Sequence, residues 1–261
     1  MQHLTRSLKD GSSLVYAWFD AMHTRIDIML WDPVMNPEDM LAVAAAIRGD
    51  VIRIEEMGSC FIPDSEVSAI NSSLPGVPVR VSEELYRILY GCLEYNDRTE
   101  GLFDVTASPL LPGVKMQDKL RLEPDGSVTR IHEAARINLS GFLKGYALDR
   151  AVEEARRNDL RSGLVSFGNS SVGAFGNHPN GEGWPVASVD IPGKNHLLKD
   201  SFLTTSGNAD ENRKHIINPW NGQFIQGKGM VSVITGTAEE GEVMSTVAFI
   251  RKNIETNNTR I

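Results

Sequence analysis

The 261-residue chain lacks several features that mark particular classes of protein. It has no run of eighteen apolar residues, so the sequence predicts no membrane segment. Its 34 acidic residues outnumber the 26 basic ones, and the net charge of −8 argues against nucleic acid or an anionic membrane as a partner. Cys60 and Cys92 lie in separate apolar segments without metal-ligand spacing, which favours reduced core thiols over a disulfide or a zinc site.

Targeting signals are also missing from the first residues, MQHLTRSLKDGSS. This stretch has neither the apolar core and cleavage site of a signal peptide nor a lipobox cysteine. We therefore expect a cytoplasmic protein. An exported, periplasmic lipoprotein stays open as the alternative, because a chain whose leader had been removed would begin in the same way.

Hydrophobic residues make up 41% of the chain, which is enough for a substantial core. We expect a single domain over residues 1–250, which can also be two intimately packed lobes, and a tail at residues 251–261. No Rossmann glycine pattern or Walker lysine motif occurs, because GNSSVG runs into a further strand instead of a helix. The known nucleotide folds built on those motifs are therefore excluded.

Helix and strand signals are mixed along the chain. Asn36 and Pro37 have the character of a helix start, and Ser82 and Gly101 bracket a second helix. A further helix is predicted to begin near Lys144, and a closing one to run from about 239 to 250. Alternation predicts strands at 25–31 and 77–81, a hairpin around EPDGS, and later strands near LVSF, VGAF, PVASVDI, FLTTS, KHIIN and MVSVIT. Successive strands with short connections favour an α+β fold with largely antiparallel sheets and packed helices.

The segment NLSGFLKGYALDR, residues 138–150, combines a turn of small residues with the start of a helix. A helix N-terminus presents unpaired N–H groups and the positive end of the helix dipole, which suit a phosphate group. Lys144 would add a full positive charge. The alternative is that Ser140 only caps the helix and that Lys144 is a solvated surface lysine.

The segment TAEEGEVMST, in the predicted last helix, places Glu242 and Thr246 four residues apart. That spacing puts a carboxylate and a hydroxyl on one helix face. Oxygen ligands of this kind suit Mg²⁺, which completes its coordination with phosphates and water. The alternative is an exposed glutamate and a threonine bonded to its own helix turn.

A third group of polar residues follows in LTTSG and KHIINPWNG. Thr205, Ser206 and Gly207 end a strand where the backbone can approach a planar ligand closely. His215 precedes the NPWNG turn and is either a general base or an ordinary edge residue. Asp104, in LFDVTASP, is a further candidate polar anchor. The six histidines show no HxxH pair, so zinc is disfavoured.

The order of these motifs resembles that of the ApbE family of FAD-dependent flavin transferases. The similar segments are FDAMHTRIDIML, PDSEVSAIN, GLFDVTASP, NLSGFLKGYALDR, TSGN, HIINPWNG and GEVMSTVAFI, which together span nearly the whole chain. The resemblance implies a T-fold-like architecture that binds FAD with Mg²⁺ at the pyrophosphate. It implies transfer of FMN to a threonine or serine of a partner flavoprotein, with release of AMP.

Matched residue by residue, the resemblance implies roles for individual side chains. The metal would be held by Glu242, Thr246 and the backbone carbonyl of Leu143. Lys144 would lie near the pyrophosphate, and His215 would deprotonate the acceptor hydroxyl. The residues that match flavin or adenosine contacts are Met22, Thr24, Asp104, Asp149 and Thr205 to Gly207.

The chain also departs from the family pattern, chiefly where larger or less acidic side chains replace the usual ones. Glu242 is one methylene longer than the expected aspartate, which matters for a Mg²⁺ shell that demands near-octahedral geometry. Two other functions therefore stay open: an FAD pyrophosphatase that uses water as acceptor, and a non-catalytic flavin-binding module. The remaining departures are His23, Asn138, Ser140, Leu143, Asn169 and Asn218.

Overall fold

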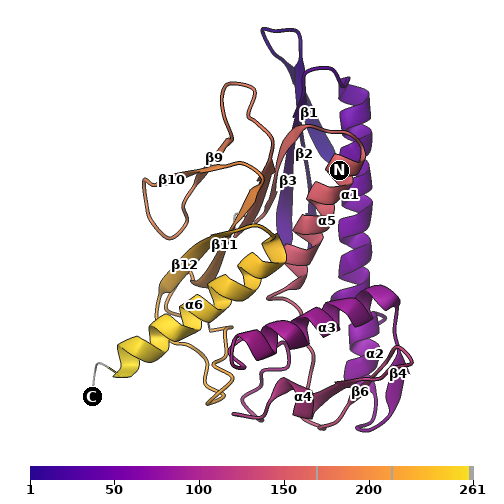
Figure 1. Ribbon diagram of the computed structural model, residues 1–261, viewed down its shortest axis with the longest axis vertical. Helices are drawn as coiled ribbons and strands as arrows, with labels where there is room; N and C mark the ends of the chain where they lie inside the picture. The colour runs from indigo at the N-terminus through magenta and orange to yellow at the C-terminus, as the bar shows by residue number, and fades with distance from the viewer. Residues whose placement is uncertain (169, 213, 259–261) are drawn as a thin grey trace. The chain divides into compact units, whose positions relative to one another are not determined.

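The computed structural model describes residues 1–168, 170–212 and 214–258, so Asn169 lies outside the described residues (Figure 1). The chain forms two compact units. Unit 1 consists of Met1–Glu55, Leu143–Ser206 and Ser232–Ser245. Unit 2 consists of Glu56–Phe142, Gly207–Val231 and Thr246–Ile261. Each unit is therefore assembled from segments that lie far apart in the sequence.

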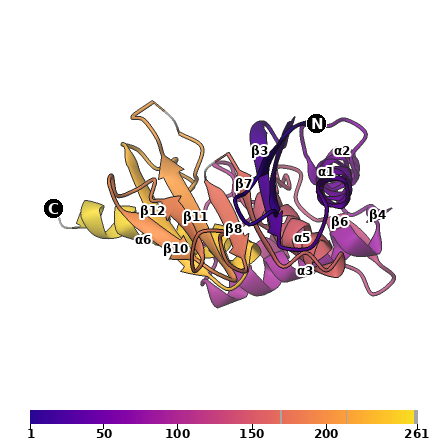
Figure 2. The same ribbon diagram turned by 90° about the horizontal axis from the view of Figure 1, so that it is seen from above.

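A seven-stranded sheet forms the centre of unit 1, in the order β1-β2-β3-β7-β8-β11-β12. Figure 2 shows β3, β7, β8 and β11 side by side in this order. The described pairings from β1 to β11 are all antiparallel. The strands are β1 (Gln2–Ser7), β2 (Ser13–Ala21), β3 (Thr24–Asp32), β7 (Ser162–Phe167), β8 (Ser171–Phe175), β11 (Ser201–Asn208) and β12 (Gly229–Thr235).

The two faces of this sheet are covered differently. On one face, Ile26, Ile28 and Leu30 of β3 are completely buried, and helix α5 (Leu143–Arg157) packs against β7 and β8. The long helix α1 (Pro37–Gly58) begins after Asn36, whose Oδ1 accepts the Asp39 N–H at 2.9 Å, as predicted for a cap. On the other face, a hairpin of β9 (Trp184–Ala187) and β10 (Asn195–Leu198) covers a cluster that includes Leu164, Val172 and Leu203.

Among the described residues, unit 2 contains a small sheet in the order β4-β6-β5 and three helices that lie wholly within it. The predicted EPDGS hairpin is confirmed: β5 (Leu120–Leu122) and β6 (Ser127–Arg130) are antiparallel, and Gly126 supplies a φ of 83°. Ser82 caps α3 (Glu83–Arg98) through the Leu85 N–H, also as predicted. The remaining elements are β4 (Pro78–Arg80), α2 (Glu66–Ser72) and α4 (Met116–Lys119).

The predicted α+β class with largely antiparallel sheets is confirmed. Three local predictions differ from the structure. KHIIN contributes only one bridge, between Ile217 and Phe224, because the turn at Asn218–Pro219 interrupts the strand. The closing helix α6 (Ala238–Asn258) continues past Ile250, since neither glycine nor proline follows to end it. Strands β1 and β2 were not predicted.

None of the helices in the described part of the chain is both long and apolar enough to cross a membrane.

Candidate functional site

Helix α5 begins at Leu143, which places Lys144 in its first turn. Ser140 lies in the preceding turn, where its N–H donates to Asn138 Oδ1 at 3.0 Å. Lys144 is half-buried, and its Nζ donates to Ser170 Oγ at 3.1 Å. The alternative of a solvated surface lysine is therefore wrong. The ammonium group of Lys144 is held near the N-terminus of a fifteen-residue helix, where the helix dipole is positive.

Glu242 lies on the second turn of α6 with only 4% of its surface exposed. Ser171 Oγ, on β8, donates to Glu242 Oε1 at 2.5 Å. Burial raises the pKa of the Glu242 carboxyl, while the positive charge of Lys144 and the Ser171 hydroxyl act to lower it. The alternative of an exposed glutamate is also wrong.

The starts of α5 and α6 are in direct contact at Gly145. A Cβ added at Gly145 would lie 2.5 Å from the Ala238 carbonyl oxygen and 2.7 Å from Glu242 Cγ. Only a glycine fits between the two helices without a shift of the backbone. This contact brings Lys144 and Glu242 to the same place, although 97 residues separate them in the sequence.

Asp149, one turn further along α5, holds the first turn of α6. Its Oδ1 accepts the Ala238 N–H at 2.8 Å and its Oδ2 accepts the Glu239 N–H at 2.9 Å. Burial raises the pKa of Asp149 to about 6, although these two N–H donors act to lower it. Both carboxylate oxygens of Asp149 are thus engaged with a helix start, and its contact with flavin or adenosine stays a prediction.

Met22 and Thr24 lie at the tight turn between β2 and β3. Met22 and His23 have φ values of 52° and 56°, which lie in the left-handed region that favours glycine. A Cβ at Gly168 would lie 2.0 Å from Thr24 Oγ1, so this turn packs closely on the loop that leads to Ser170. A cleft of about 440 Å³ opens here, lined by residues 20–25 and Glu55.

The predicted strand end at residues 205–207 is tied to the same loop. The Thr205 N–H donates to the Ser170 carbonyl oxygen at 2.7 Å. Thr205 Oγ1 and Ser232 Oγ lie 2.7 Å apart, as do the hydroxyls of Ser206 and Ser245. In unit 2, Gly207 has a φ of 150°, and a Cβ there would lie 2.1 Å from the Gly229 carbonyl oxygen.

Unit 1 thus brings together the ammonium group of Lys144, the buried carboxylate of Glu242 and the serine hydroxyls that are bonded to them. Thr24, Lys144, Thr205 and Glu242 were predicted from the sequence. Ser170 and Ser171 were not, because GNSSVG carries no dinucleotide motif and nothing in the local sequence indicates that these serines meet Lys144 and Glu242.

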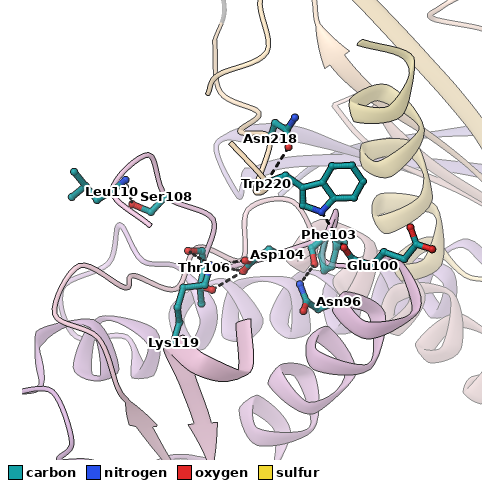
Figure 3. A network of polar contacts seen from close by, with 10 residues as sticks. All are labelled: Asn96, Glu100, Phe103, Asp104, Thr106, Ser108, Leu110, Lys119, Asn218 and Trp220. Carbon is teal, nitrogen blue, oxygen red and sulfur yellow. Dashed lines mark hydrogen bonds and ion pairs between the residues drawn. The ribbon is translucent and has the colours of Figure 1, made fainter. Parts of the chain in front are cut away.

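Asp104 lies in unit 2 as one half of a buried ion pair (Figure 3). Lys119 Nζ is 2.6 Å from Asp104 Oδ2, and the two side chains are 1% and 2% exposed. Thr106 donates to Asp104 Oδ1 from both its N–H, at 2.7 Å, and its hydroxyl, at 2.6 Å. These contacts give Asp104 a structural role in unit 2, and a contact with a ligand stays a prediction.

The other predicted residues of unit 2 are His215 and Thr246. His215 is exposed and precedes the turn in which Asn218 Oδ1 accepts the Trp220 N–H at 3.0 Å (Figure 3). An aspartate could accept the same bond, so Asn218 forms this turn without adding a negative charge. Thr246 is half-buried, one turn after Glu242 on α6.

The described residues include no group of three or more His, Cys, Asp or Glu side chains that could hold a metal ion. A cation at Glu242 would therefore need hydroxyl, carbonyl, water or phosphate oxygens as its other ligands. That donor set is typical of Mg²⁺.

Comparison with known proteins identifies the family. The model of the ApbE family matches residues 22–258. The chain belongs to the ApbE family. The resemblance drawn from the motifs is confirmed, and the match covers nearly all of this ApbE-family chain.

Its curated relatives include the FAD:protein FMN transferases of Chlamydia muridarum and Haemophilus influenzae. The first is 24% identical over 226 residues, which cover 74% of this chain and 71% of the relative. The second is 23% identical over 235 residues, which cover 74% and 67%.

Solved structures of the family share the fold. The ApbE protein from Thermotoga maritima superposes with a TM-score of 0.78 at 24% identity, over 94% of this chain and 92% of that one. The flavinyl transferase ApbE of Pseudomonas stutzeri, in its apo form, gives 0.80 at 18% identity, over 90% and 84%.

Proposed function

We propose that this ApbE-family protein is a Mg²⁺-dependent FAD:protein FMN transferase. It would move FMN from FAD to a threonine or serine hydroxyl of a partner flavoprotein and release AMP. The relatives named above carry this activity in their names. The observation in this chain that supports the proposal most is the contact at Gly145, which brings Lys144 and the buried Glu242 together.

The residues around the start of α5 fit a diphosphate. The first turn of a helix has N–H groups without intrahelical partners, and the helix dipole favours negative charge there. Lys144 adds a positive charge, and the hydroxyl of Ser170, which accepts from Lys144, adds a polar contact at the same place. We propose that these groups bind the pyrophosphate of FAD.

The residues also fit Mg²⁺. A carboxylate has about four lone-pair sites, so Glu242 keeps acceptor capacity after the bond from Ser171. Burial raises the pKa of Glu242, and a bound cation would favour the charged form again. The Leu143 carbonyl has a second lone pair beyond its helix bond, and Thr246 adds a hydroxyl. When bound, Mg²⁺ would neutralise the negative charge that develops on the diphosphate.

The chain's own residues would perform the remaining tasks. Met22, Thr24 and residues 205–207 would orient the dinucleotide, and Lys144 would bind a diphosphate oxygen. The acceptor hydroxyl oxygen would form a bond to the FMN phosphorus while the P–O bond to AMP breaks. His215 would take the hydroxyl proton. Asp149, whose carboxylate holds α6, would keep Glu242 in place.

A product analysis tests this function against the two alternatives. The protein is incubated with FAD and Mg²⁺, with and without the acceptor flavoprotein of the Haemophilus influenzae transferase. If the protein is a transferase, the amount of AMP released should equal the amount of flavin that becomes covalently bound to the acceptor. Free FMN and AMP without acceptor would identify a pyrophosphatase. FAD bound without AMP release in either mixture would identify a binding module and overturn the proposal.

A further inference from the structure

Ser171 has a completely buried side chain at the start of β8. Its hydroxyl hydrogen is donated to Glu242 Oε1 at 2.5 Å, across 71 residues of sequence. Within the described part of the chain, Oε2 of Glu242 has no hydrogen-bond partner. One oxygen of this carboxylate is therefore fixed by the protein, and the other keeps its acceptor capacity.

The extra methylene of Glu242 is what allows this contact. Glu242 Cγ lies against the bare Cα of Gly145, in space that any other residue at 145 would fill. An aspartate at 242 would hold its carboxylate about 1.5 Å closer to α6, the length of one carbon–carbon bond. A 2.5 Å hydrogen bond from Ser171 would then be lost at the same backbone positions.

We propose that Ser171 is the positioning residue that adapts this chain to a glutamate at 242. Its hydroxyl fixes the longer carboxylate so that the remaining oxygen can serve the cation. The inference rests on the proposed function in one respect, that Mg²⁺ is the ion bound. The coupling between Ser171 and Glu242 does not depend on any ligand.

A double-mutant cycle in Mg²⁺ affinity tests the positioning role. The variants are Ser171→Ala, Glu242→Asp and the double variant, and isothermal titration calorimetry measures Mg²⁺ binding in the presence of ADP, whose diphosphate stands in for that of FAD. Ser171→Ala is expected to weaken Mg²⁺ binding about tenfold, as for other groups that orient a metal ligand. In the Glu242→Asp background the same change should alter affinity less than about twofold.

Ser162→Ala is the matched control. Ser162 is also a buried strand serine of unit 1, and its Oγ donates to backbone carbonyls and accepts from Trp184 Nε1. Its loss should lower the melting temperature and leave Mg²⁺ affinity unchanged. An equal effect of Ser171→Ala in the glutamate and aspartate backgrounds, or no effect in either, would overturn the inference.

Thermal unfolding of the same variants in EDTA separates this inference from the proposed function. Without metal, Ser171→Ala should lower the melting temperature by roughly 5 °C when residue 242 is glutamate and by less than about 1 °C when it is aspartate. Equal shifts in both backgrounds would refute the coupling whether or not Mg²⁺ binds. A wild-type protein that shows the coupled shifts and binds no Mg²⁺ would refute only the metal in the proposed function.

Discussion

Each unit buries a carboxylate, and the two carboxylates are partnered in different ways. Asp104 in unit 2 has a lysine at 2.6 Å and two donors from Thr106, so its charge is neutralised within the protein. Glu242 in unit 1 accepts one hydroxyl, and the nearby Lys144 bonds to Ser170 instead. Both carboxylates are buried, so burial does not distinguish them. What distinguishes them is the hydrogen-bonding capacity that Glu242 keeps, and the proposed function assigns that capacity to a cation.

The largest effect should come from breaking the pair in unit 2. Lys119→Met leaves Asp104 buried and uncompensated, which should lower the free energy of unfolding by about 3 to 5 kcal/mol. Urea denaturation followed by circular dichroism measures this. The double variant Asp104→Asn with Lys119→Met removes both charges and should recover most of the loss. If the double variant were as unstable as the single one, the ion pair would not be the cause.

Removing the charge of Glu242 should instead affect activity. Glu242→Gln keeps the shape and the acceptor for Ser171, and metal-dependent AMP release should fall about 100-fold or more. Chromatography of AMP measures the rate, and circular dichroism checks that the fold is kept. Glu240→Gln removes the same charge from the same helix and serves as the control. Unchanged AMP release by Glu242→Gln would show that the assignment of the metal ligand is wrong.

The contact between α5 and α6 should tolerate no side chain at residue 145. Gly145→Ala forces a methyl group against the Ala238 carbonyl and Glu242, and should cost about 2 kcal/mol of stability. The displaced Glu242 should also weaken Mg²⁺ binding. At Gly141 an added Cβ meets nothing within 4 Å, so Gly141→Ala is the control within the same segment. Similar effects of the two substitutions would argue against the steric explanation.

The smallest expected effect is a pH dependence from Asp149. Its pKa rises from 3.8 when unfolded to about 6 when folded, so the folded state holds the proton more tightly. The stability from this group is therefore present at pH 4 and lost as the pH rises to 6, by about 1 to 2 kcal/mol.

Urea denaturation of the wild type and of Asp149→Asn between pH 4 and 8 gives the free energy of unfolding of each protein. The difference between the two values, followed against pH, measures the contribution of Asp149. The wild type should lose stability relative to the variant up to pH 6 and then run parallel to it. Glu94→Gln, which changes an exposed acid on α3, should run parallel to the wild type over the whole range. Parallel curves of the wild type and Asp149→Asn over the whole range would contradict the raised pKa.

Much of this arrangement was predictable from the sequence where local chemistry decides it. Asn36 and Ser82 cap their helices, and the EPDGS turn forms its hairpin, because these choices depend on neighbouring residues alone. The pairing of Lys144 with Glu242 required the family resemblance. The spacing of residues within one helix cannot reveal which other helix lies beside it.

Other features could not be predicted because they depend on partners distant in sequence. Ser171 meets Glu242, Asp149 meets the start of α6, and Lys119 meets Asp104, and none of these pairs has a local signal. Strand β1 was missed for another reason. All six of its residues are exposed, so it lacks the alternation of buried and exposed side chains that marks a strand.

The absence of a side chain at Gly145 also has a mechanical consequence. Close backbone contact there, together with the two hydrogen bonds that Asp149 accepts from α6, ties the first turns of α5 and α6 to each other. We expect that a displacement of one turn also displaces the other. We therefore expect a ligand bound at one turn to change affinity at the other, and thermodynamic reciprocity requires that the influence be equal in both directions.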